Sequence, residues 1–506
     1  MNNLLDHPLV QEVRRIAQAR HISLILVGGA VRDWLMGHEV RDLDFAVQGN
    51  ARQLARAVAD ATGGAYYLMD AERNTARVIV TQGNRSAIPA RITASFHLDF
   101  AVCRGETWAE DLFGRDFSVN AMALDVLTGA LLDPTGGQSD LQYKLVRQVT
   151  THAMTDDPVR ALRAVRTMHL LGGRLDSVTA QSISRAATHL DQPSPERVRD
   201  ELMKVLDLPD AMSAVRQLDT LGLLPKIVPE VDLMRDCTQS APHQFTVLEH
   251  TFVVLEAVDR LIHGLRSASQ EEAPGFLRSF LPLSSSHASA LLEQLDAVTA
   301  DERMRKAVFR LAVLLHDVAK PARRRIGEDG CIHFSGHEEA GAEMAASRAA
   351  ALRMSGEETR QVRTTVRHHG VPNKMEAGQD TSLNPHAVYR FMHDAGRCAP
   401  EIALFCLADG YGKAGPEASH DDLRRRGAIA SHLIERYEEH YKPSVAPKPL
   451  VSGADILALG IPKGPRIGQA LQAIREAQMV GELTTRDDAL SLARHLETYP
   501  DGRPDV

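Results

Sequence analysis

The feature that most constrains this chain is a short apolar run that ends in a glycine pair near the N-terminus. Residues 22–27 predict a strand, and Gly28 and Gly29 follow it directly. Glycines let the backbone approach phosphate closely, and the helix predicted at 30–36 would direct free N–H groups toward the same place. Arg32 lies in the first turn of that helix. This arrangement predicts a phosphate-binding turn in which Arg32 reaches a phosphate oxygen.

The next predicted strand covers 43–47, and two aspartates, one in it and one directly before it, point to the same face. Asp42 and Asp44 are two residues apart, and side chains alternate along a strand. Asp99, between apolar neighbours in the strand predicted at 96–102, is a third carboxylate that can join them. Paired carboxylates can hold two Mg²⁺ ions, which activate a hydroxyl and stabilise a leaving pyrophosphate. We predict catalytic roles for all three, with Asp42 and Asp44 as Mg²⁺ ligands, against the simpler reading of a turn and a solvated strand end.

Composition limits the remaining possibilities. The chain has 506 residues, 44% hydrophobic and 25% charged, which at roughly 100–200 residues per domain predicts about three or four globular domains. No apolar stretch reaches the ~18 residues of a membrane helix, no secretory signal is visible, and the five cysteines form no CxxC pair. We therefore expect a cytoplasmic protein without a membrane partner. The net charge of −8 means that any nucleic acid must bind a local basic surface.

The order of predicted elements indicates how the chain is divided. Helices and strands alternate over 1–150, which predicts an α/β domain. The sequence shows no internal repeat. Helical periodicity then dominates, interrupted by prolines near 225–229 and by a proline-rich linker before the last segment. We predict a helical neck over 151–235, an all-α domain over 236–442 and a small helical tail over 451–506.

A second set of chemical residues lies in the third of these regions. Histidines and aspartates recur in or beside apolar helical segments, including a His-Asp pair and a His-His pair. Imidazoles and carboxylates together bind divalent transition metals, and a bound metal generates hydroxide near neutral pH. Single buried histidines are usually ordinary core residues, but so many in one region favour a metal site. The predicted ligands are His250, His316, Asp317, His337, His368 and Asp409.

Five motifs in order give the chain a resemblance to a known family. GGAVRDWLMGHEVRDLDFAV, EDLFGRDFSVNAMALD, DPTGGQSDL, DDPVRALRAVR and SPERVRDELMKVL resemble the motifs of the class II CCA-adding tRNA nucleotidyltransferase and poly(A) polymerase family. The segment 451–490 is similar to the C-terminal unit of that family. Residues 245–410 resemble the HD phosphohydrolase family, with His337 and His368 as accessory histidines. The resemblance implies a polymerase-β-like nucleotidyltransferase head, a helical neck, an HD domain and a helical tail.

The resemblance also implies activities and residue roles. It implies transfer of CMP and AMP from CTP and ATP to the 3′ end of tRNA. For the HD domain it implies 2′,3′-cyclic phosphodiesterase or phosphatase activity with Mn²⁺, Ni²⁺ or Co²⁺. The implied nucleotide-binding residues are Gly28, Gly29, Arg32 and Arg115 for triphosphate, Asp116 and Asn120 for the sugar or the neighbouring loop, and Asp157, Arg160 and Arg163 on the base-reading helix.

Asp157 and Arg160 suit base selection because their donors and acceptors match two of the four bases. Cytosine and adenine each present an amino donor beside a ring-nitrogen acceptor, whereas uracil and guanine present the reverse. Leaving both side chains unpaired costs about 1–3 kcal/mol per buried polar group. An ordinary ion pair at a helix start, with Asp156 as N-cap, is the alternative. Gly114 and Asp156 depart from the family, which usually has arginine and glutamate at these positions.

Other functions remain open on the sequence. A poly(A) polymerase, or an enzyme that adds only A or only CC, shares the same motifs. A protein-modifying nucleotidyltransferase fused to an HD hydrolase lacks the base-reading neck and the RNA-type tail. A non-catalytic RNA-binding descendant would not need the retained carboxylates and metal ligands. The sequence does not indicate the oligomeric state.

Overall fold

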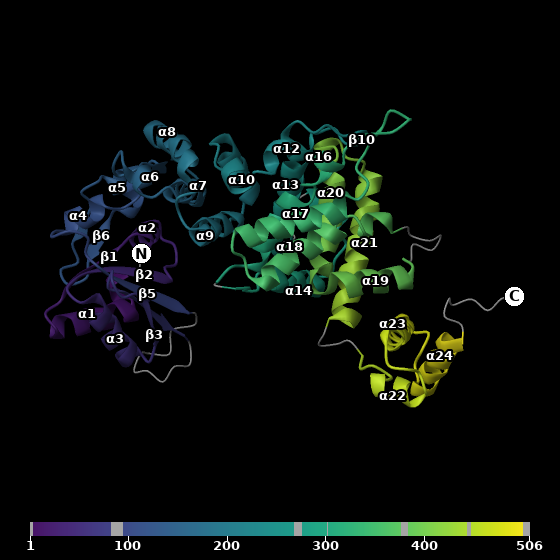
Figure 1. Cartoon of the computed structure of the whole chain (residues 1–506). Helices are drawn as coiled ribbons and strands as arrows, with labels where there is room; N and C mark the ends of the chain where they lie inside the picture. Colours follow the sequence, from purple (N-terminus) through teal and green to yellow (C-terminus); the bar gives the residue numbers. More distant parts are fainter. Residues whose placement is uncertain are drawn as a thin grey trace. The chain divides into compact units, whose positions relative to one another are not determined.

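The structure is a computed structural model, and its chain divides into two compact units. It describes residues 4–81, 95–267, 276–300, 302–375, 383–442 and 447–498. The first unit comprises Met1–Glu201 and Gln217–Ile227, and the second comprises Leu202–Arg216 and Val228–Val506 (Figure 1). The segment predicted as the neck is thus shared between the two units. No described helix is long and apolar enough to cross a membrane.

The first unit is built on one seven-stranded sheet, with strand order β3-β4-β5-β2-β1-β6-β7. The pair β2 and β5 is parallel, and every other neighbouring pair is antiparallel. Strand β3 was not predicted, because its consecutive apolar residues Tyr67, Leu68 and Met69 are exposed and show no alternation. The strands are β1 Ser23–Val27, β2 Asp42–Gln48, β3 Ala65–Asp70, β4 Thr75–Val80, β5 Phe96–Val102, β6 Ala123–Asp125 and β7 Leu131–Leu132.

Two helices cover one face of this sheet, and the opposite face carries a smaller apolar cluster beside the aspartates of β2. Helix α1 (Pro8–Ala19) packs on α3 (Ala51–Thr62), which in turn packs on β4 and β5. Alternate residues of β2, namely Leu43, Phe45 and Val47, are buried in this core. Because side chains alternate along a strand, the aspartates between them point away from the core. The expected shared face of the two aspartates is confirmed.

Short helices complete the first unit, and one of them begins later than expected. Asp157 precedes α7 in an extended conformation (φ −151°, ψ 95°), and the helix starts at Arg160. Pro158 is the cause, because a residue before proline is disfavoured in the helical region. The remaining elements are α2 Gly29–Leu35, α4 Trp108–Phe113, α5 Gly137–Gln142, β8 Leu145–Val146, α6 Ala153–Asp156, α7 Arg160–Leu171, β9 Arg174–Leu175, α8 Ser177–Ala186, α9 Pro195–Leu206 (which runs into the second unit), α10 Ala211–Thr220 (which begins in the second unit) and α11 Leu224–Ile227.

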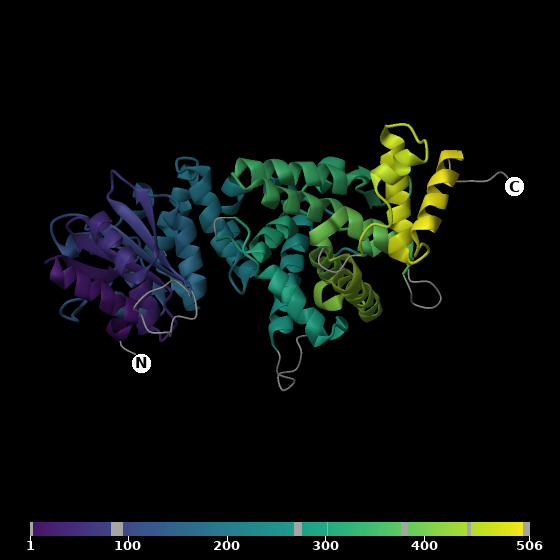
Figure 2. The same ribbon diagram turned by 90° about the horizontal axis from the view of Figure 1, so that it is seen from below.

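The second unit is helical apart from one small hairpin, β10 (Arg325–Ile326) with β11 (Ile332–His333). Its central helix, α20, is buried along its whole length and packs on α13 and α21. The helices are α12 Val231–Arg235, α13 Val247–Arg266, α14 Ser285–Leu295, α15 Arg305–Leu315, α16 Lys320–Arg323, α17 His337–Ala351, α18 Gly356–His368, α19 Pro385–Ala395, α20 Ala399–Gly412, α21 His420–Arg436, α22 Gly453–Ala458, α23 Pro465–Val480 and α24 Arg486–Thr498. The last three, yellow in Figure 2, form a small core around Ile456 and Ile474.

One histidine joins α19 to the tail. His386 contacts two carboxylates, Glu476 at 2.9 Å through Nδ1 and Glu482 at 3.0 Å through Nε2. These two hydrogen bonds raise the pKa of His386. A histidine whose pKa is raised in the folded state stabilises the fold below its unfolded pKa of about 6.5, and this contribution is lost as the pH rises through the folded pKa.

We therefore predict that the docking of α23 on α19 loosens at alkaline pH. The effect is small because the imidazole is exposed and screened by solvent. Hydrogen exchange of the α23 amides, corrected for intrinsic rates, should show protection that falls severalfold between pH 6 and pH 8.5. In His386→Ala the protection should be low at both pH values. An unchanged pH dependence in this variant would assign the effect to another group.

Candidate nucleotidyl-transfer site and HD metal site

The carboxylates of the first site are brought together by β2 and β5. These parallel strands pair in a register that places Asp44 directly beside Asp99. Burial, and then repulsion from Asp99, raise the pKa of Asp44 to about 6. A crowded group of carboxylates with one raised pKa is electrostatically unfavourable until a cation neutralises it. Asp42 and Asp44 therefore fit a divalent metal ion, which they would hold on the open face of the sheet.

Asp99 is engaged differently from the other two aspartates. Arg77 on β4 donates two hydrogen bonds to it, Nε to Oδ1 at 2.8 Å and Nη2 to Oδ2 at 2.9 Å. This bidentate pair neutralises one of the three carboxylates. Sequence analysis did not select Arg77, although a single arginine within the apolar strand TARVIV was a usable signal.

Gly28 allows two charged groups to meet beside the backbone. Its φ is +76°, and a Cβ built there would lie 3.3 Å from Oδ2 of Asp44 and 3.4 Å from Nη1 of Arg115. Arg115 is fixed by the buried Asp111, whose Oδ2 accepts from Nε at 3.1 Å and from Nη2 at 2.9 Å. A guanidinium is thus held next to the metal-binding carboxylates, where a phosphate group would carry its charge.

Arg32 does not point toward an open phosphate site as expected. The residue is 8% exposed, and its guanidinium donates to both carboxylate oxygens of Asp33 and, at 2.7 Å, to Oδ1 of Asn120. Asn120 in turn donates to Asp116 at 3.1 Å. The sequence showed only that Arg32 begins a helix, whereas the fold places Asn120 against it. Arg32 and Asn120 therefore brace the site, while Gly29 lies directly against the Arg32 guanidinium.

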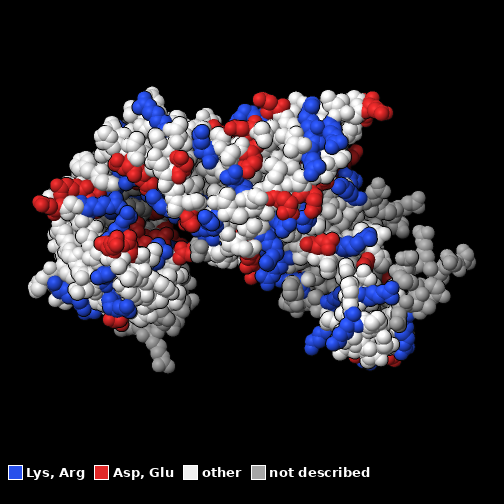
Figure 3. Space-filling view, in the orientation of Figure 1, with Lys and Arg blue, Asp and Glu red and all other residues white. Residues whose placement is uncertain are grey.

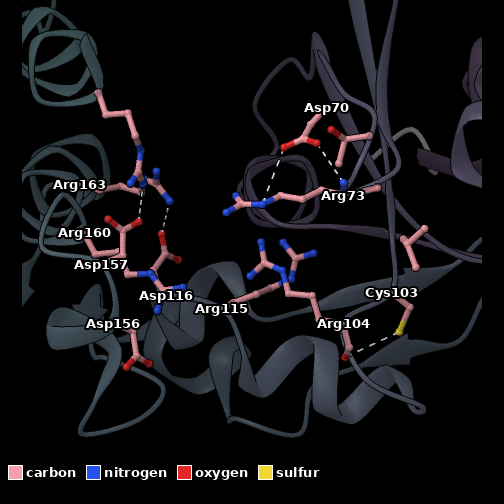
Figure 4. Close-up of a pocket in the computed structure, with 14 residues that line it drawn as sticks. Asp70, Arg73, Cys103, Arg104, Arg115, Asp116, Asp156, Asp157, Arg160 and Arg163 are labelled. Carbon is pink, nitrogen blue, oxygen red and sulfur yellow. Dashed lines mark hydrogen bonds and ion pairs between the residues drawn. The ribbon is translucent and has the colours of Figure 1, made fainter. Parts of the chain in front are cut away.

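Six arginines and four aspartates of the first unit line a cavity of about 960 Å³, while Asp42, Asp44 and Asp99 are not among its lining residues (Figure 4). Drug-sized ligands bind in cavities of roughly 300–1,000 Å³, so this space is adequate for a nucleotide. Acidic and basic side chains are interspersed on the face shown in Figure 3. The arginines that line the cavity are therefore a local group and not part of a large basic surface on this face. The cavity is lined by Asp70, Arg73, Thr75, Ala101, Val102, Cys103, Arg104, Arg115, Asp116, Asp156, Asp157, Arg160, Arg163 and Arg197.

The residues predicted to read the base line this cavity but are not paired with one another. Asp157 accepts from Arg197 at 2.6 Å, so its partner comes from α9 and not from α7. Arg160 donates to the carbonyl oxygens of Ala153 and Gly114, at 3.3 and 3.1 Å. The expectation of a common helix face is wrong for Asp157, because Pro158 excludes it from the helix. Both side chains still face the same space.

Arg163 belongs to a buried network at the back of the cavity. Its Nη1 donates to Asp116 at 3.0 Å and its Nε to Glu201 at 3.4 Å. Burial would raise the pKa of Asp116, but the opposing charge of Arg163 outweighs it and the pKa is lowered. Asp116 is therefore held as a carboxylate that joins α7 to the loop after α4.

The second unit gathers four histidines and two aspartates around one point. Two overlapping groups of potential metal ligands share Asp317: His250 with His316, and His337 with His369. Asp409 on α20 lies 3.4 Å from Nε2 of His250. Each imidazole has its Nδ1 within 2.7–2.9 Å of a backbone carbonyl oxygen, which assigns the proton to Nδ1 and leaves Nε2 for a metal. The carbonyls are those of Gly412, Val313, Phe334 and Val366, for His250, His316, His337 and His369 respectively.

Buried polar atoms without hydrogen bonds show that this cluster fits a metal ion. Nε2 of His250, Nε2 of His316 and Oδ1 of Asp317 are buried and make no hydrogen bond, and Oδ2 of Asp317 is ion-paired with Lys320. Burial alone would raise the pKa of Asp317, but His316 and Lys320 hold it well below its usual range. Lys320 Nζ lies 2.6 Å from Asp317 and 2.7 Å from the side-chain oxygen of Gln239. A cation at this point would satisfy the orphaned atoms.

His369, and not the predicted His368, belongs to this cluster. The His369 ring lies 5.2 Å from that of His316 and 5.5 Å from that of His337. In the described part of the chain, His368 is in neither ligand group. Consecutive residues at the end of a helix point in different directions, so only one of the pair can face the cluster. The sequence contained both histidines and no local signal to choose between them.

The two sites define a nucleotidyltransferase head joined to a metal-binding HD domain. Comparison with known families agrees: the poly A polymerase head domain matches residues 24–147, its probable RNA-binding region 174–234, and the HD domain 285–414. A-adding tRNA nucleotidyltransferase of Deinococcus radiodurans is 31% identical, over 92% of this chain and 93% of that protein. CC-adding tRNA nucleotidyltransferase of Thermus thermophilus is also 31% identical, over 95% and 96%.

Solved structures show the same fold. A CCA-adding enzyme in apo form II has a TM-score of 0.55 at 17% identity, covering 98% of this chain and 96% of that one. A tRNA-processing enzyme in apo form I has a TM-score of 0.54 at 20% identity, covering 93% and 96%. The chain belongs to the tRNA nucleotidyltransferase and poly(A) polymerase family, in the form that carries an HD domain. It is an enzyme of the nucleotidyltransferase class, and both of its domain types bind divalent metal ions.

Proposed function

We propose that this chain adds CMP and AMP to the 3′ end of tRNA, using CTP and ATP. One observation carries the proposal: the side chains suited to base selection line the same cavity as Arg115, which lies beside Asp44. A nucleotide in this cavity would have its base near Asp157 and Arg160 and its phosphates near Arg115. The names of the relatives, which are tRNA nucleotidyltransferases, support tRNA as the acceptor.

Base selection follows from the chemistry of the cavity. The Asp157 carboxylate can accept a hydrogen bond from the amino group of cytosine or adenine, while the Arg160 guanidinium donates one to the ring nitrogen. Arg197 holds Asp157 in place, so the carboxylate is already oriented before a base arrives. Uracil or guanine would leave these groups unpaired. No nucleic-acid template is needed for this choice.

The metal of the head is proposed to be Mg²⁺, held by Asp42 and Asp44. When bound, Mg²⁺ supplies activation of the attacking hydroxyl and neutralises the leaving pyrophosphate. The chain itself contributes the Arg115 guanidinium beside the phosphates, and the Arg77–Asp99 pair, which limits the negative charge near the ions. Gly28 keeps the backbone clear of both groups.

A narrower reaction is the second candidate, because relatives of equal similarity are named for adding only A or only CC. A poly(A) polymerase is the further alternative from the same family. Incubation with tRNAs that end before CCA, after CC, or complete, with each nucleoside triphosphate separately, distinguishes these activities. A complete CCA-adding activity is shown if the protein adds two CMP residues from CTP and then one AMP from ATP, and stops after A. Repeated AMP addition would identify a poly(A) polymerase.

We predict that Asp157→Ala relaxes base choice. Incorporation of UMP and GMP relative to CMP and AMP should rise about five- to hundredfold, since the discrimination rests on about 1–3 kcal/mol of unpaired polar groups. Single-turnover assays with all four triphosphates measure this ratio. Arg15→Ala, which removes an exposed guanidinium on α1, is the matched control. If the overall rate falls with an unchanged ratio, Asp157 is structural and base selection lies elsewhere.

For the HD domain we propose a phosphohydrolase that uses Mn²⁺, Ni²⁺ or Co²⁺, the ions suited to imidazole and carboxylate ligands. The residues that would hold them are Asp317, the four clustered histidines and Asp409. The two ligand groups that share Asp317 leave room for either one ion or two. We also propose a reducing, cytoplasmic location, supported by five cysteines that are all free.

A further inference from the structure

The cavity of the first unit contains a guanidinium that no role has yet been given. Arg104 follows β5 and lines the cavity together with Arg115 and Arg160. Arginines in such a site are usually neutralised by nearby carboxylates, as Arg163 is by Asp116 and Arg197 by Asp157. Within the described residues, neither Arg104 nor Arg160 forms an ion pair. Each donates instead to a neutral acceptor, the carbonyl oxygen of Gly114, at 3.2 and 3.1 Å.

The position of Arg104 is set by the same carboxylate that sets Arg115. The buried Asp111 accepts the backbone N–H of Arg104 through Oδ1 at 2.9 Å, and the Arg115 guanidinium through Oδ2. Arg115 lies close enough to Arg104 for the two charges to interact (Figure 4). Two adjacent guanidinium groups with one carboxylate between them have an excess of positive charge. They therefore favour an anion in the cavity.

Gly114 leaves the space in which Arg104 extends. A Cβ built on Gly114 would lie 3.6 Å from Cδ of Arg104 and 3.4 Å from the carbonyl oxygen of Asp111, which are ordinary contacts. A side chain at position 114 would therefore begin beside the Arg104 side chain. Because positions 104 and 114 are neighbours, an arginine introduced at position 114 offers a test of whether the guanidinium of Arg104 can be replaced.

We propose that Arg104, together with Arg115, binds a phosphate group of the incoming nucleoside triphosphate. This inference rests on the proposed function, because it assigns the substrate of that reaction to the cavity. The nucleotide is favoured over a phosphate of tRNA, since Arg115, which lines the cavity, also lies beside Gly28 and Asp44, and the reacting phosphates must meet the metal-binding carboxylates. Arg104 extends that phosphate-binding surface by one guanidinium.

The test compares the Michaelis constants of Arg104→Ala with those of the wild type. The KM for both ATP and CTP should rise about ten- to hundredfold, as expected for the loss of a charge-assisted hydrogen bond. The kcat should change less than about threefold, and the KM for tRNA should not change. Inhibition by inorganic tripolyphosphate should weaken by a similar factor. Arg15→Ala, which removes an exposed arginine on α1 that neither lines the cavity nor lies in the matched RNA-binding region, should leave all of these values at the wild-type level.

Two further variants separate charge from structure. Arg104→Lys should give an intermediate KM, because lysine keeps the charge without the planar fork. Arg104→Ala combined with Gly114→Arg should recover at least part of the lost affinity, which a purely structural role would not allow. An unchanged KM for the nucleotides in Arg104→Ala overturns the proposal. A raised KM for tRNA alone also overturns it, by assigning Arg104 to the acceptor.

These measurements also separate this proposal from the proposed function. Binding of tripolyphosphate, followed by calorimetry, does not depend on nucleotide addition. If the wild-type protein fails to extend tRNA, the proposed function fails, whereas a weaker affinity of Arg104→Ala for tripolyphosphate still supports the phosphate site. If tRNA is extended and that affinity does not change, the Arg104 proposal alone is wrong.

Discussion

Replacing Asp42 or Asp44 by alanine is expected to lower nucleotide addition at least about a thousandfold while the fold persists. Each change removes a ligand from the metal-binding face of β2, and metal ions supply several kcal/mol of charge stabilisation in such reactions, at 1.36 kcal/mol per tenfold in rate. Incorporation of labelled CMP and AMP into tRNA measures the loss. Full activity in either variant would show that Asp42 and Asp44 are not the metal ligands.

Thermal melting of the same variants supplies the control for folding. Burial and repulsion from Asp99 raise the pKa of Asp44 to about 6, so its charge destabilises the metal-free head above that pH. Asp44→Asn removes this charge with little change in shape. The variant should therefore be at least as stable as the wild type at pH 8, yet inactive. A large loss of stability at pH 8 would instead indicate a structural role.

The second large effect is expected in the HD domain. Replacing His316 and Asp317 together by alanine should remove the bound transition metal and lower hydrolysis of 2′,3′-cyclic nucleotides at least about a thousandfold. Addition of nucleotides to tRNA should stay within about twofold of the wild type. The reason is that ligands must converge within about 2–2.5 Å of their ion, and the two ligand sets belong to different compact units.

The outcome separates a catalytic metal from a structural one. A structural metal contributes folding energy, so its loss would unfold the second unit. A large drop in melting temperature, with no hydrolysis by the metal-loaded wild type, would contradict the proposed phosphohydrolase. Metal content by mass spectrometry, measured on wild type and variant, shows that the site was loaded in the comparison. The converse experiment, Asp42→Ala, should leave hydrolysis intact.

Much of the candidate site was predictable because its signals are local. Alternation along β2 placed Asp42 and Asp44 on one face, and the strand predicted at 96–102 is observed as Phe96–Val102. The histidines and aspartates of the HD domain stood out by residue type within apolar helices. Such features depend on a few neighbouring residues and on the geometry of one element. Three-dimensional contacts were not needed to find them.

Partner choice was not predictable, because it depends on residues far apart in the chain. Arg32 appeared free in the sequence, but the fold brings Asn120 against it. Asp157 was predicted to lie on the same helix as Arg160 and to read the base with it, but Pro158 excludes Asp157 from that helix, and its ion-pair partner is Arg197 on α9. Arg77 gave only the signal of a single arginine within an apolar strand, and Arg104 lies outside the motifs. Their importance emerges only when neighbouring strands and loops place them beside Asp99 and Arg115.

By itself, the sequence predicted a nucleotidyltransferase head and an HD domain, because carboxylates, glycines and imidazoles at short spacings indicate which element carries them and on which face. The tertiary structure decided how those groups are used. It selected His369 over His368, neutralised Asp99 with Arg77 and, among the residues that the structure describes, left the Arg104 guanidinium without an ion pair. The physical reason is that an ion pair or a metal ligand set requires atoms within a few ångströms of one another, and residues tens or hundreds of positions apart meet only when the helices and strands pack.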